Sequence, residues 1–417
     1  MKQYLLGLVT ILLLLYACGN RQSGNCATFE SNGINYEIVD AEAHSVAVGR
    51  TTHASGAITI PSTVKYKGKQ YAVVAIADSA FASCKHLTSL VIPPSMTEIG
   101  DSAFAGCLSL SSIDIPNSIS KIGDKAFLRC RNLKSISLSE SLTSIGKGVF
   151  YDCRNMTHIA IPSSVVSIGA QAFARCESLE SIHIPQSITY IGDFAFFRCG
   201  SLKTFIIPRG VTRINTGVFS ECTMLKFVEI HDDVEYIGDS AFSDCQELPR
   251  IAIPENINEI GECSFYGCHS LKEVEINASL TVIPRAAFYN CRSLETINLP
   301  KSLTAINRSA FFGCTGLTMI CIPENVAYIG ENVFENCENL KSVEIPSSLT
   351  TLPERTFYNC YHLEEIINHS PIPQRVMDHI FHAVATSTRI YVPKGSVSAY
   401  QTATGWKRFS EIHEIPG

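Results

Sequence analysis

Apolar residues return to the same places every 23 residues along most of this 417-residue chain. One repeat reads Ile-Gly-x-x-Ala-Phe-x-x-Cys-x-x-Leu-x-x-Ile-x-Ile-Pro, and a further apolar position precedes the next Ile-Gly pair. Thirteen cysteines mark the repeat, with no insertion or deletion between them: Cys84, Cys107, Cys130, Cys153, Cys176, Cys199, Cys222, Cys245, Cys268, Cys291, Cys314, Cys337 and Cys360. Phenylalanine stands three residues before each of these cysteines, and leucine stands three residues after each, except at Met156. A fixed period in the twenties predicts a solenoid, because each repeat then forms one coil that buries its apolar face only against its neighbours.

The pattern inside one repeat assigns its parts. In residues 110–116 isoleucines alternate with polar residues, which is the period of a strand with one buried face. Ile119 and Ile122 predict a second, shorter extended segment, and residues 124–130 predict a helical turn capped by Asp124. Thirteen such coils, stacked at an interstrand spacing of about 4.8 Å, predict a rod about 60 Å long with a parallel sheet along its side.

Residues 29–77 precede the regular repeats, which we expect over residues 78–366. This first block holds short β-branched runs separated by Asn-Gly, Gly-Arg, Ser-Gly and Lys-Gly-Lys, which predict strands joined by tight turns. The expected strands are 34–39, 45–48, 57–60 and 71–76, and the expected hairpin tip is 67–69. Because the outer face of a terminal coil meets water, we interpret the block as an N-terminal β cap.

Residues 367–417 leave the 23-residue pattern and predict a mixed C-terminal cap. Two prolines interrupt the repeat, residues 374–384 are typical of an amphipathic helix, and residues 389–393 predict a last strand. Three large aromatic residues are expected to cover the exposed end of the core: Tyr400, Trp406 and Phe409. Deleting residues 371–417 is expected to expose the apolar face of the last coil.

The first 28 residues indicate export and anchoring. A basic start and an apolar run in residues 1–17 fit a signal peptide, since the run is too short to span a membrane as a helix. The ending Leu-Tyr-Ala-Cys resembles the lipobox of bacterial lipoproteins, which implies that Cys18 becomes the acylated first residue; ordinary cleavage is the alternative. Several acyl chains on one residue would hold the protein on a membrane, and residues 18–28 predict a flexible tether. Gly19 resembles outer-membrane sorting, and the tether lacks the acidic run that resembles a surface-export signal, so the side of the membrane stays open.

Composition narrows the function classes. The formal net charge of −6 is mild for this length and argues against a nucleic-acid partner.

Equivalent positions on stacked strands lie about 4.8 Å apart, whereas the Cβ atoms of a disulfide lie about 3.8 Å apart. We therefore expect the repeat cysteines to be buried free thiols, with metal or redox work as the alternative. Cys263 and Cys321 lie outside the repeat position and are either reactive thiols or tolerated substitutions.

The repeat Ala-Phe-x-x-Cys-x-x-Leu-x-x-Ile-x-Ile-Pro, followed by Ile-Gly, resembles the BspA-like leucine-rich repeat family over residues 76–366. The segments 389–396, 399–400 and 406–409 resemble the C-terminal cap of Bacteroidetes members. The resemblance implies a leucine-rich repeat solenoid: a right-handed coil with a parallel β-sheet, short helical turns, a β-rich N-terminal cap and a mixed C-terminal cap. It also implies a cell-surface or secreted binding protein, with adhesion to host matrix proteins or to other microbes described for some members.

Outward strand positions lie five and seven residues after each repeat cysteine and form two columns along the predicted sheet. Small hydroxyl residues dominate the first third of these columns. An apolar spot with charged neighbours then follows: Ile206, Phe227, Glu229, Arg250, Glu273 and Glu275. An aromatic ring and an arginine inside a charged rim are typical of an interface hot spot. The group is either a ligand site or ordinary surface variation.

Two other groups compete as binding surfaces. Tyr190, Arg213 and Tyr236 occupy equivalent positions on consecutive coils, where the guanidinium is expected to stack between two rings as a second candidate patch or as plain stabilisation. Five arginines near the corner of neighbouring coils are either contacts for an anionic glycan or acidic partner, or a solvated face. They are Arg129, Arg131, Arg154, Arg175 and Arg198.

Catalytic chemistry is hard to find in this sequence. No Gly-x-Ser-x-Gly, His-Glu-x-x-His, phosphate-binding glycine loop or Cys-x-x-Cys motif occurs. Two groups of histidines are at most weak metal sites, because neither offers three ligands in a closed pocket. They are His158 with His183, and Asp378 with His379 and His382 on one face of the predicted helix.

The sequence therefore predicts a non-enzyme without metal or cofactor. We expect a lipid-anchored outer-membrane protein that presents its repeat surface to a protein or glycan of a host or microbial surface. The alternative is a periplasm-facing scaffold of the cell envelope. The family resemblance favours the cell surface, while the missing acidic tether favours the periplasmic side slightly.

Overall fold

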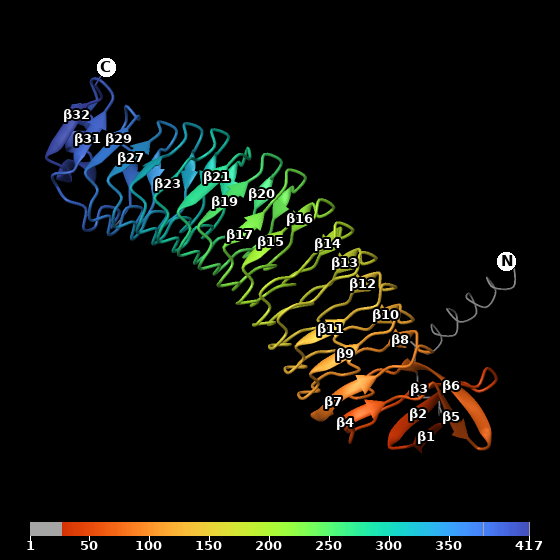
Figure 1. Ribbon diagram of the computed structural model, residues 1–417. Coiled ribbons are helices and arrows are strands. Elements are labelled where there is room, and N and C mark those ends of the chain that lie inside the picture. The colour runs from red at the N-terminus through yellow and green to blue at the C-terminus, as the bar shows by residue number, and fades with distance from the viewer. Residues whose placement is uncertain (1–26, 378, 417) are drawn as a thin grey trace.

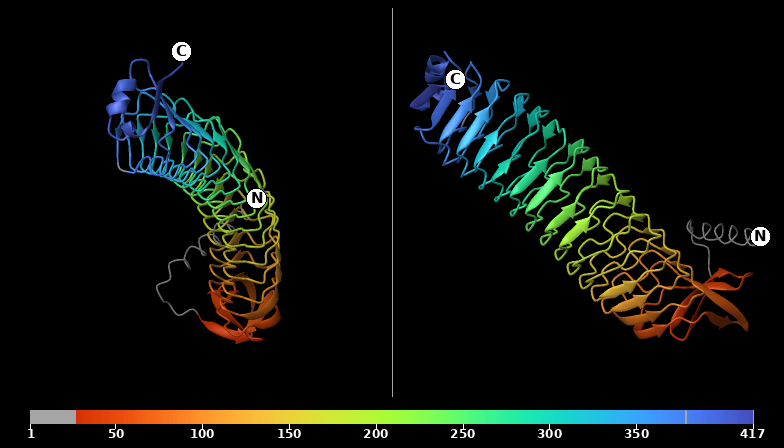
Figure 2. Two further views of the ribbon diagram at one scale, coloured as in Figure 1. Left: turned by 90° about the vertical axis from the view of Figure 1, so that its left-hand side faces the viewer. Right: turned by 45° about the horizontal axis from the view of Figure 1, so that its top comes forward.

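The computed structural model describes residues 27–377 and 379–416. The chain forms an elongated, curved solenoid in which each 23-residue repeat is one coil (Figure 1). Two further views show that the rod bends along its length and that the coils stack side by side throughout (Figure 2). The predicted signal peptide, the lipidated Cys18 and most of the predicted tether lie outside the described residues.

The predicted strand forms a ladder of parallel strands along one side of the rod in all but two repeats, where only an isolated bridge joins Ala160 and His183. Its members are β4 (Ser55–Thr59), β7 (His86–Val91), β9 (Ser112–Asp114), β11 (Ser135–Ser137), β15 (Thr204–Ile206), β17 (Phe227–Glu229), β19 (Arg250–Ile253), β21 (Glu273–Ile276), β23 (Thr296–Ile297), β25 (Met319–Cys321), β27 (Ser342–Ile345), β29 (Glu365–Asn368), β31 (Arg389–Val392) and β32 (Glu411–Glu414). Equivalent residues of successive coils pair in register, as Ser112 with Ser135 and Arg250 with Glu273. We call the outward side of this ladder the strand face.

The shorter extended segment predicted after each strand forms a second parallel ladder. Its members are β6 (Lys69–Ile76), β8 (Glu98–Ile99), β10 (Lys121–Ile122), β12 (Ser144–Ile145), β13 (Ser167–Ile168), β14 (Tyr190–Ile191), β16 (Arg213–Ile214), β18 (Tyr236–Ile237), β20 (Glu259–Ile260), β22 (Val282–Ile283), β24 (Ala305–Ile306), β26 (Tyr328–Ile329), β28 (Thr351–Leu352) and β30 (Arg375–Val376). Ile119 and Ile122 are buried as the sequence predicts.

The helical turn predicted for residues 124–130 is wrong. Lys125 and Arg129 each have a φ of 58°, in the left-handed region that no right-handed helix contains. The N–H of Phe127 donates to the carbonyl of Val149 on the next coil at 2.9 Å. Stacked coils offer backbone partners across the boundary, so the corner bonds to its neighbour and forms a third ladder in place of a helix.

Asp124 also acts between coils rather than within its own turn. Its carboxylate accepts the N–H of Lys147 on the next coil at 2.8 Å, and Asp101 accepts the N–H of Asp124 in the same way at 2.8 Å. The side chain therefore accepts a backbone N–H at the start of the corner in the next coil. The sequence alone predicts an N–H of its own coil as the partner.

The core is a continuous stack of the repeat side chains. The repeat phenylalanines are buried and stack ring on ring, with centroids 5.2 Å apart for Phe104 and Phe127 and 6.0 Å apart for Phe357 and Phe381. Beside them, each repeat thiol from Cys107 onward donates to the carbonyl of a phenylalanine in the preceding coil, as Cys222 does to Phe196 at 3.2 Å, while Cys84 donates to the carbonyl of Thr51 at 2.9 Å. The described thiols are free and those of the repeat are buried, as the sequence predicts.

The N-terminal block adds four strands to the start of the second ladder, in antiparallel pairings except for the parallel pairing that joins the block's third strand to β6. They are β1 (Thr28–Ser31), β2 (Ile34–Asp40), β3 (Ser45–Val48) and β5 (Thr63–Tyr66). β5 and β6 form a hairpin in which Tyr66 pairs with Lys69, and the two residues between them, Lys67 and Gly68, have φ values of 46° and 79°. Positive φ at both positions fits the tight turn that the Lys-Gly-Lys sequence predicts.

The C-terminal end contains the only helices of the described chain, α2 (Val397–Thr402) and the 3-10 turn η1 (Trp406–Arg408). The amphipathic helix predicted for residues 374–384 is wrong, because β30 and a further corner occupy this segment. The segment thus makes one more irregular coil, and packing on the preceding coil overrides its local helical pattern. The three predicted covering residues are buried: Tyr400, Trp406 and Phe409.

Candidate functional site

The apolar and charged group picked out from the sequence lies on four neighbouring strands of the strand face. Ile206 on β15 is 55% exposed and Phe227 on β17 is 42% exposed. Arg250 on β19 pairs in register with Glu273 on β21. The alternation of each strand explains this placement, since residues five and seven positions after the cysteine point away from the core.

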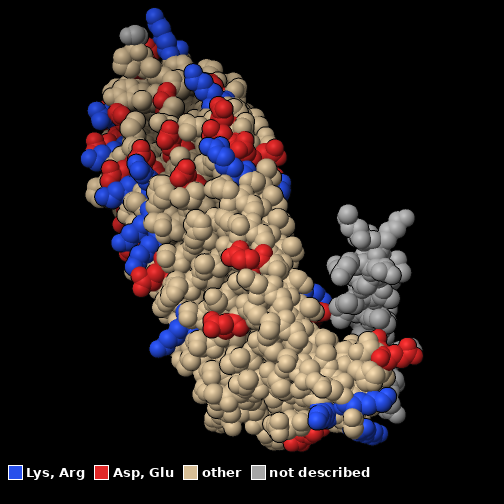
Figure 3. All heavy atoms as spheres, turned by 45° about the vertical axis from the view of Figure 1, so that its right-hand side comes forward, with Lys and Arg blue, Asp and Glu red and all other residues tan. Residues whose placement is uncertain are grey.

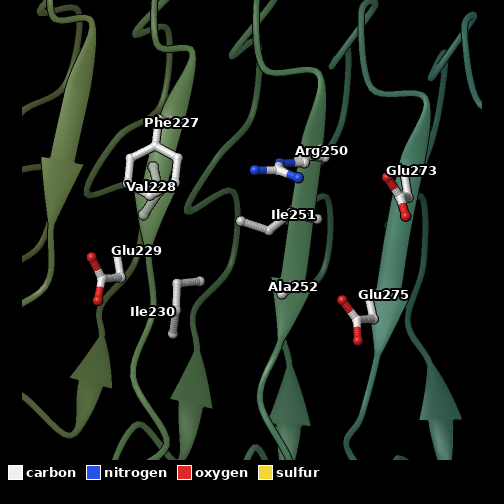
Figure 4. A pocket seen from close by; sticks show the side chains of 9 residues that line it. All are labelled: Phe227, Val228, Glu229, Ile230, Arg250, Ile251, Ala252, Glu273 and Glu275. Atoms are coloured by element: carbon white, nitrogen blue, oxygen red, sulfur yellow. The ribbon is translucent and has the colours of Figure 1, made fainter.

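A hollow of about 230 Å³ opens between β17 and β19 at this place. Its walls and floor are Phe227, Val228, Glu229, Ile230, Arg250, Ile251, Ala252, Glu273 and Glu275. Figure 4 shows the Arg250 side chain reaching from β19 toward Phe227, while the Glu229 and Glu275 carboxylates stand on either side of Ala252. Five of the six candidate residues therefore line one hollow; Ile206 lies one strand away on β15 and is not part of its wall.

The charges of the hollow are not neutralised by one another. Within residues 27–377 and 379–416, no ion pair within 4.0 Å includes Arg250, Glu229, Glu273 or Glu275. The Asn277 side-chain amide donates to the Glu275 carboxylate at 3.2 Å. One arginine and three glutamates give the hollow a formal charge of −2. Such a shallow, open surface suits a side chain of a macromolecular partner better than an enclosed small molecule.

The second candidate patch is a stack of one ring and one guanidinium. Arg213 on β16 lies over the Tyr236 ring on β18, 4.0 Å from its centroid, whereas the sequence led us to expect two rings. Tyr190 is 51% exposed on β14. Burial and nearby carboxylates raise the pKa of Tyr236. The patch therefore contains one contact between a guanidinium and a ring on neighbouring coils.

The arginine stripe at the corners is largely paired. Arg131, Arg154 and Arg175 converge on the buried carboxylate of Asp152, at 2.9, 2.7 and 3.8 Å. Burial alone would raise the pKa of Asp152, but the hydrogen bonds from Arg154 and Arg131 outweigh it and lower that pKa. Arg198 pairs with Glu221 at 2.6 Å. Most arginines of the stripe thus form ion pairs with carboxylates of this chain, which weakens the stripe as a site for an anionic partner.

The thiols of Cys263 and Cys321, which lie outside the repeat position, have raised pKa values. Burial raises the pKa of Cys321 to about 11, and the neighbouring Glu344 carboxylate acts in the same direction. Burial also raises the pKa of the half-buried Cys263, which has a φ of 55°. Since the thiolate is the nucleophile, neither side chain has the lowered pKa of a reactive cysteine.

The described residues contain no group of three or more His, Cys, Asp or Glu side chains placed to hold a metal ion. His183 pairs across the ladder with Ala160, two residue positions away from Ser181, which lies opposite His158 in this register. His379 has a φ of 59° and lies in a corner rather than on a helix, and Asp378 lies outside the described residues.

Sequence reasoning missed a half-buried aromatic stack at the corners. Tyr266, Tyr289 and Phe312 stack at 4.8 and 4.5 Å between centroids. Their shared position, two residues before the repeat cysteine, is aromatic in three consecutive repeats, which is the signal that predicts the stack.

One face of the rod differs in charge along its length. Figure 3 shows Lys, Arg, Asp and Glu side chains gathered toward the C-terminal end and again at the N-terminal end, while the stretch of this face between them carries few charges. Every helix of the described residues is too short to cross a bilayer.

The fold is that of a leucine-rich repeat solenoid, and comparison with known proteins gives its family. The model of the BspA type leucine rich repeat region matches residues 57–176, 143–269 and 235–364. The chain belongs to the BspA-type leucine-rich repeat family. Members and structural neighbours are repeat scaffolds, generally without enzymatic activity.

Two solved structures are similar over most of their length. A leucine-rich repeat protein from Bacteroides ovatus is 31% identical, with a TM-score of 0.80, over 93% of this chain and 100% of that one. A leucine rich cell surface protein from Faecalibacterium prausnitzii is 29% identical, with a TM-score of 0.58, over 83% of this chain and 95% of that one. Comparison with curated proteins gave no match.

Proposed function

We propose that this protein is a non-enzymatic binding protein of the cell envelope that recognises a macromolecule through the hollow between β17 and β19. The observation that carries the proposal is the coincidence of an exposed aromatic ring, an arginine and three glutamates in one hollow, with no ion pair among these charges in the described chain. Exposed apolar groups with a charged rim are typical of protein interfaces.

The family and the leucine rich cell surface protein from Faecalibacterium prausnitzii favour a position outside the cytoplasm. The lipobox-like ending at Cys18 supports anchoring on a membrane through acyl chains. The protein then stands on the outer membrane and presents its strand face to a protein or glycan of a host or microbial surface. Adhesion follows from this arrangement, since an anchored rod holds a rigid binding surface away from the bilayer.

The experiment that tests the location is protease shaving of intact cells that carry the full chain. Loss of the solenoid, with a periplasmic protein left intact as the leakage control, is the expected result. Protection of the solenoid in intact cells, with digestion only after the outer membrane is opened, would contradict surface display. It would support the periplasm-facing scaffold, for which the missing acidic tether is the sequence argument.

The experiment that tests the hollow is a comparison of adhesion by two variants. The test variant, Phe227→Ala with Arg250→Ala, removes the centre of the hollow. The control variant, Met319→Ala, removes a side chain that is 54% exposed and lies in the same column, three coils beyond β19. Adhesion of cells to a coated surface of host matrix protein should fall at least about tenfold in the first variant, for a loss of about 1.4 kcal/mol, and stay unchanged in the second. Equal adhesion by both variants would contradict the assignment of the hollow.

A further inference from the structure

One residue interrupts the backbone bonding of the strand face. Four residues after each repeat cysteine, the N–H donates to the carbonyl of the equivalent residue in the preceding coil. Lys226 bonds to Lys203 at 2.8 Å and Lys272 bonds to Pro249 at 2.9 Å, and this series runs from Ser111 to Arg389. Pro249 occupies this position in its coil and has no N–H, so the series is broken there.

The break leaves β17 and β19 without a backbone bond along the strand face. Among the described residues, the carbonyl of Lys226 accepts no backbone hydrogen bond. β15 and β17 form one sheet, while β19, β21 and β23 form another. Other coil boundaries where strand pairing lapses keep the bond at this position, as Thr157 to Lys134 at 3.3 Å and Thr318 to Glu295 at 3.1 Å. A second hollow of about 280 Å³ lies beside β11, at a boundary that keeps this bond. Among the described repeats, the hollow between β17 and β19 lies at the boundary where proline removes the bond.

The side chains around the opening give it a definite chemistry. Ala252 pairs in register with Glu275, and Glu229 holds the equivalent position on β17. A methyl group thus separates two exposed carboxylates, and Ile230 adds apolar surface beside it (Figure 4). An apolar floor between two carboxylates fits a side chain with an aliphatic stem and a cationic head, since such residues bury the stem and keep the charge at the rim.

We infer that the hollow opened by Pro249 receives a lysine or arginine side chain from an exposed segment of a protein partner. This inference rests on the proposed function and names the partner's chemistry. The formal charge of −2 and the unneutralised carboxylates supply the complementarity, and the exposed ring of Phe227 supplies apolar contact next to the bound cation. Arg250, which reaches toward Phe227, leaves the space between Glu229 and Glu275 to the partner.

Carbodiimide cross-linking tests this inference, because it joins a carboxylate to a primary amine only when the two touch. The probe is a blocked Gly-Phe-Lys-Phe-Gly peptide, added to the full chain in detergent and followed by mass spectrometry of the modified glutamates. Glu324 is the internal control, since it is exposed on a turn beyond β25 and far from the hollow. We expect peptide adducts at Glu229 and Glu275 at least about tenfold above those at Glu324, which corresponds to about 1.4 kcal/mol.

Two variants separate the role of Pro249 from general effects on folding. Pro249→Ser restores the N–H and should close the opening, and Ala252→Leu fills the floor without changing a backbone bond. Both should reduce the adducts at Glu229 and Glu275 to the level of Glu324, while the circular dichroism spectrum stays that of the parent. Adducts spread equally over the three glutamates would overturn the inference, and so would adducts that neither variant reduces. If adhesion still depends on Phe227 and Arg250 in that case, the binding site stands and only the partner chemistry is wrong.

Discussion

The ladder of buried thiols predicts an unusually steep loss of stability in alkali. Burial raises the pKa of Cys107, Cys222 and Cys314 to about 12, against an ordinary value of 9.0. A group whose folded pKa is raised supports the folded state fully below its unfolded pKa. That support is lost as the pH rises from about 9 toward the folded pKa, because only the unfolded chain ionises in this window.

The magnitude follows from the linkage relation. Between pH 8 and pH 10 an unfolded thiol with a pKa of about 9 gains about 1.4 kcal/mol from ionisation, while a folded thiol with a pKa of about 12 gains almost nothing. The free energy of unfolding should therefore fall by about 1.4 kcal/mol for each repeat thiol exposed. A triple variant with Cys107→Ala, Cys222→Ala and Cys314→Ala should lose about 4 kcal/mol of this pH dependence.

Urea unfolding at pH 8, 9 and 10, followed by circular dichroism, measures the effect in the parent and in the triple variant. Because the two proteins differ only at the three cysteines, the contribution of tyrosine and lysine ionisation cancels in the comparison. The reasoning is refuted if the two proteins lose the same stability between pH 8 and pH 10. It is also refuted if thiolate absorbance near 240 nm appears in the parent before the fold is lost.

Three further predictions concern the aromatic stack, the Asp152 ion pairs and the C-terminal cap. Phe219→Ala should lower the free energy of unfolding by about 3–5 kcal/mol, because the buried ring stacks on Phe196 and Phe242 at 5.8 and 5.5 Å. Phe227→Ala should change it by less than about 0.5 kcal/mol. Similar urea midpoints for the two variants would contradict this prediction. Asp152→Asn should lower the free energy of unfolding by about 1–2 kcal/mol at pH 7, less than for a fully buried pair because the arginines are partly exposed. The difference from the parent should vanish as the pH falls below about 4, because protonation of Asp152, whose pKa is lowered in the folded state, removes this stabilisation. A difference that persists in acid would count against the pairing. Deletion of residues 371–417 should produce aggregates in size-exclusion chromatography, and a soluble monomer would show that these residues do not cap the core.

Repetition made most of the fold predictable. One strand period in residues 110–116, copied without a gap, gives the first ladder, and Ile119 with Ile122 gives the second. Contacts between coils were harder to predict. The corner at residues 124–130 has a helical apolar pattern, but alternate N–H groups, those of Lys125, Phe127 and Arg129, bond to the next coil. Residues 374–384 have the same pattern and likewise pack as part of a coil.

In the candidate site, too, the positions of side chains could be predicted from the repeat, whereas the contacts between coils could not. Exposure of Phe227 and Arg250 follows from strand alternation, so their meeting with Glu229, Glu273 and Glu275 could be predicted from the period alone. The opening beneath them could not, because it lies where the pairing of strands lapses between β17 and β19, and the period does not signal such a lapse. Pro249 is the residue that signals it, since proline cannot donate where every neighbouring repeat does.

Site-specific photo-cross-linking tests the central claim most directly. A photoreactive phenylalanine analogue replaces either Phe227, in the hollow, or Met319, in the same column of the strand face. Cells that carry each variant are irradiated while bound to the coated surface. The account predicts a cross-linked product at position 227 that disappears when Glu229→Gln and Glu275→Gln are added, and no such product at position 319. Equal products at the two positions, or a product at 227 that survives loss of both carboxylates, would contradict it.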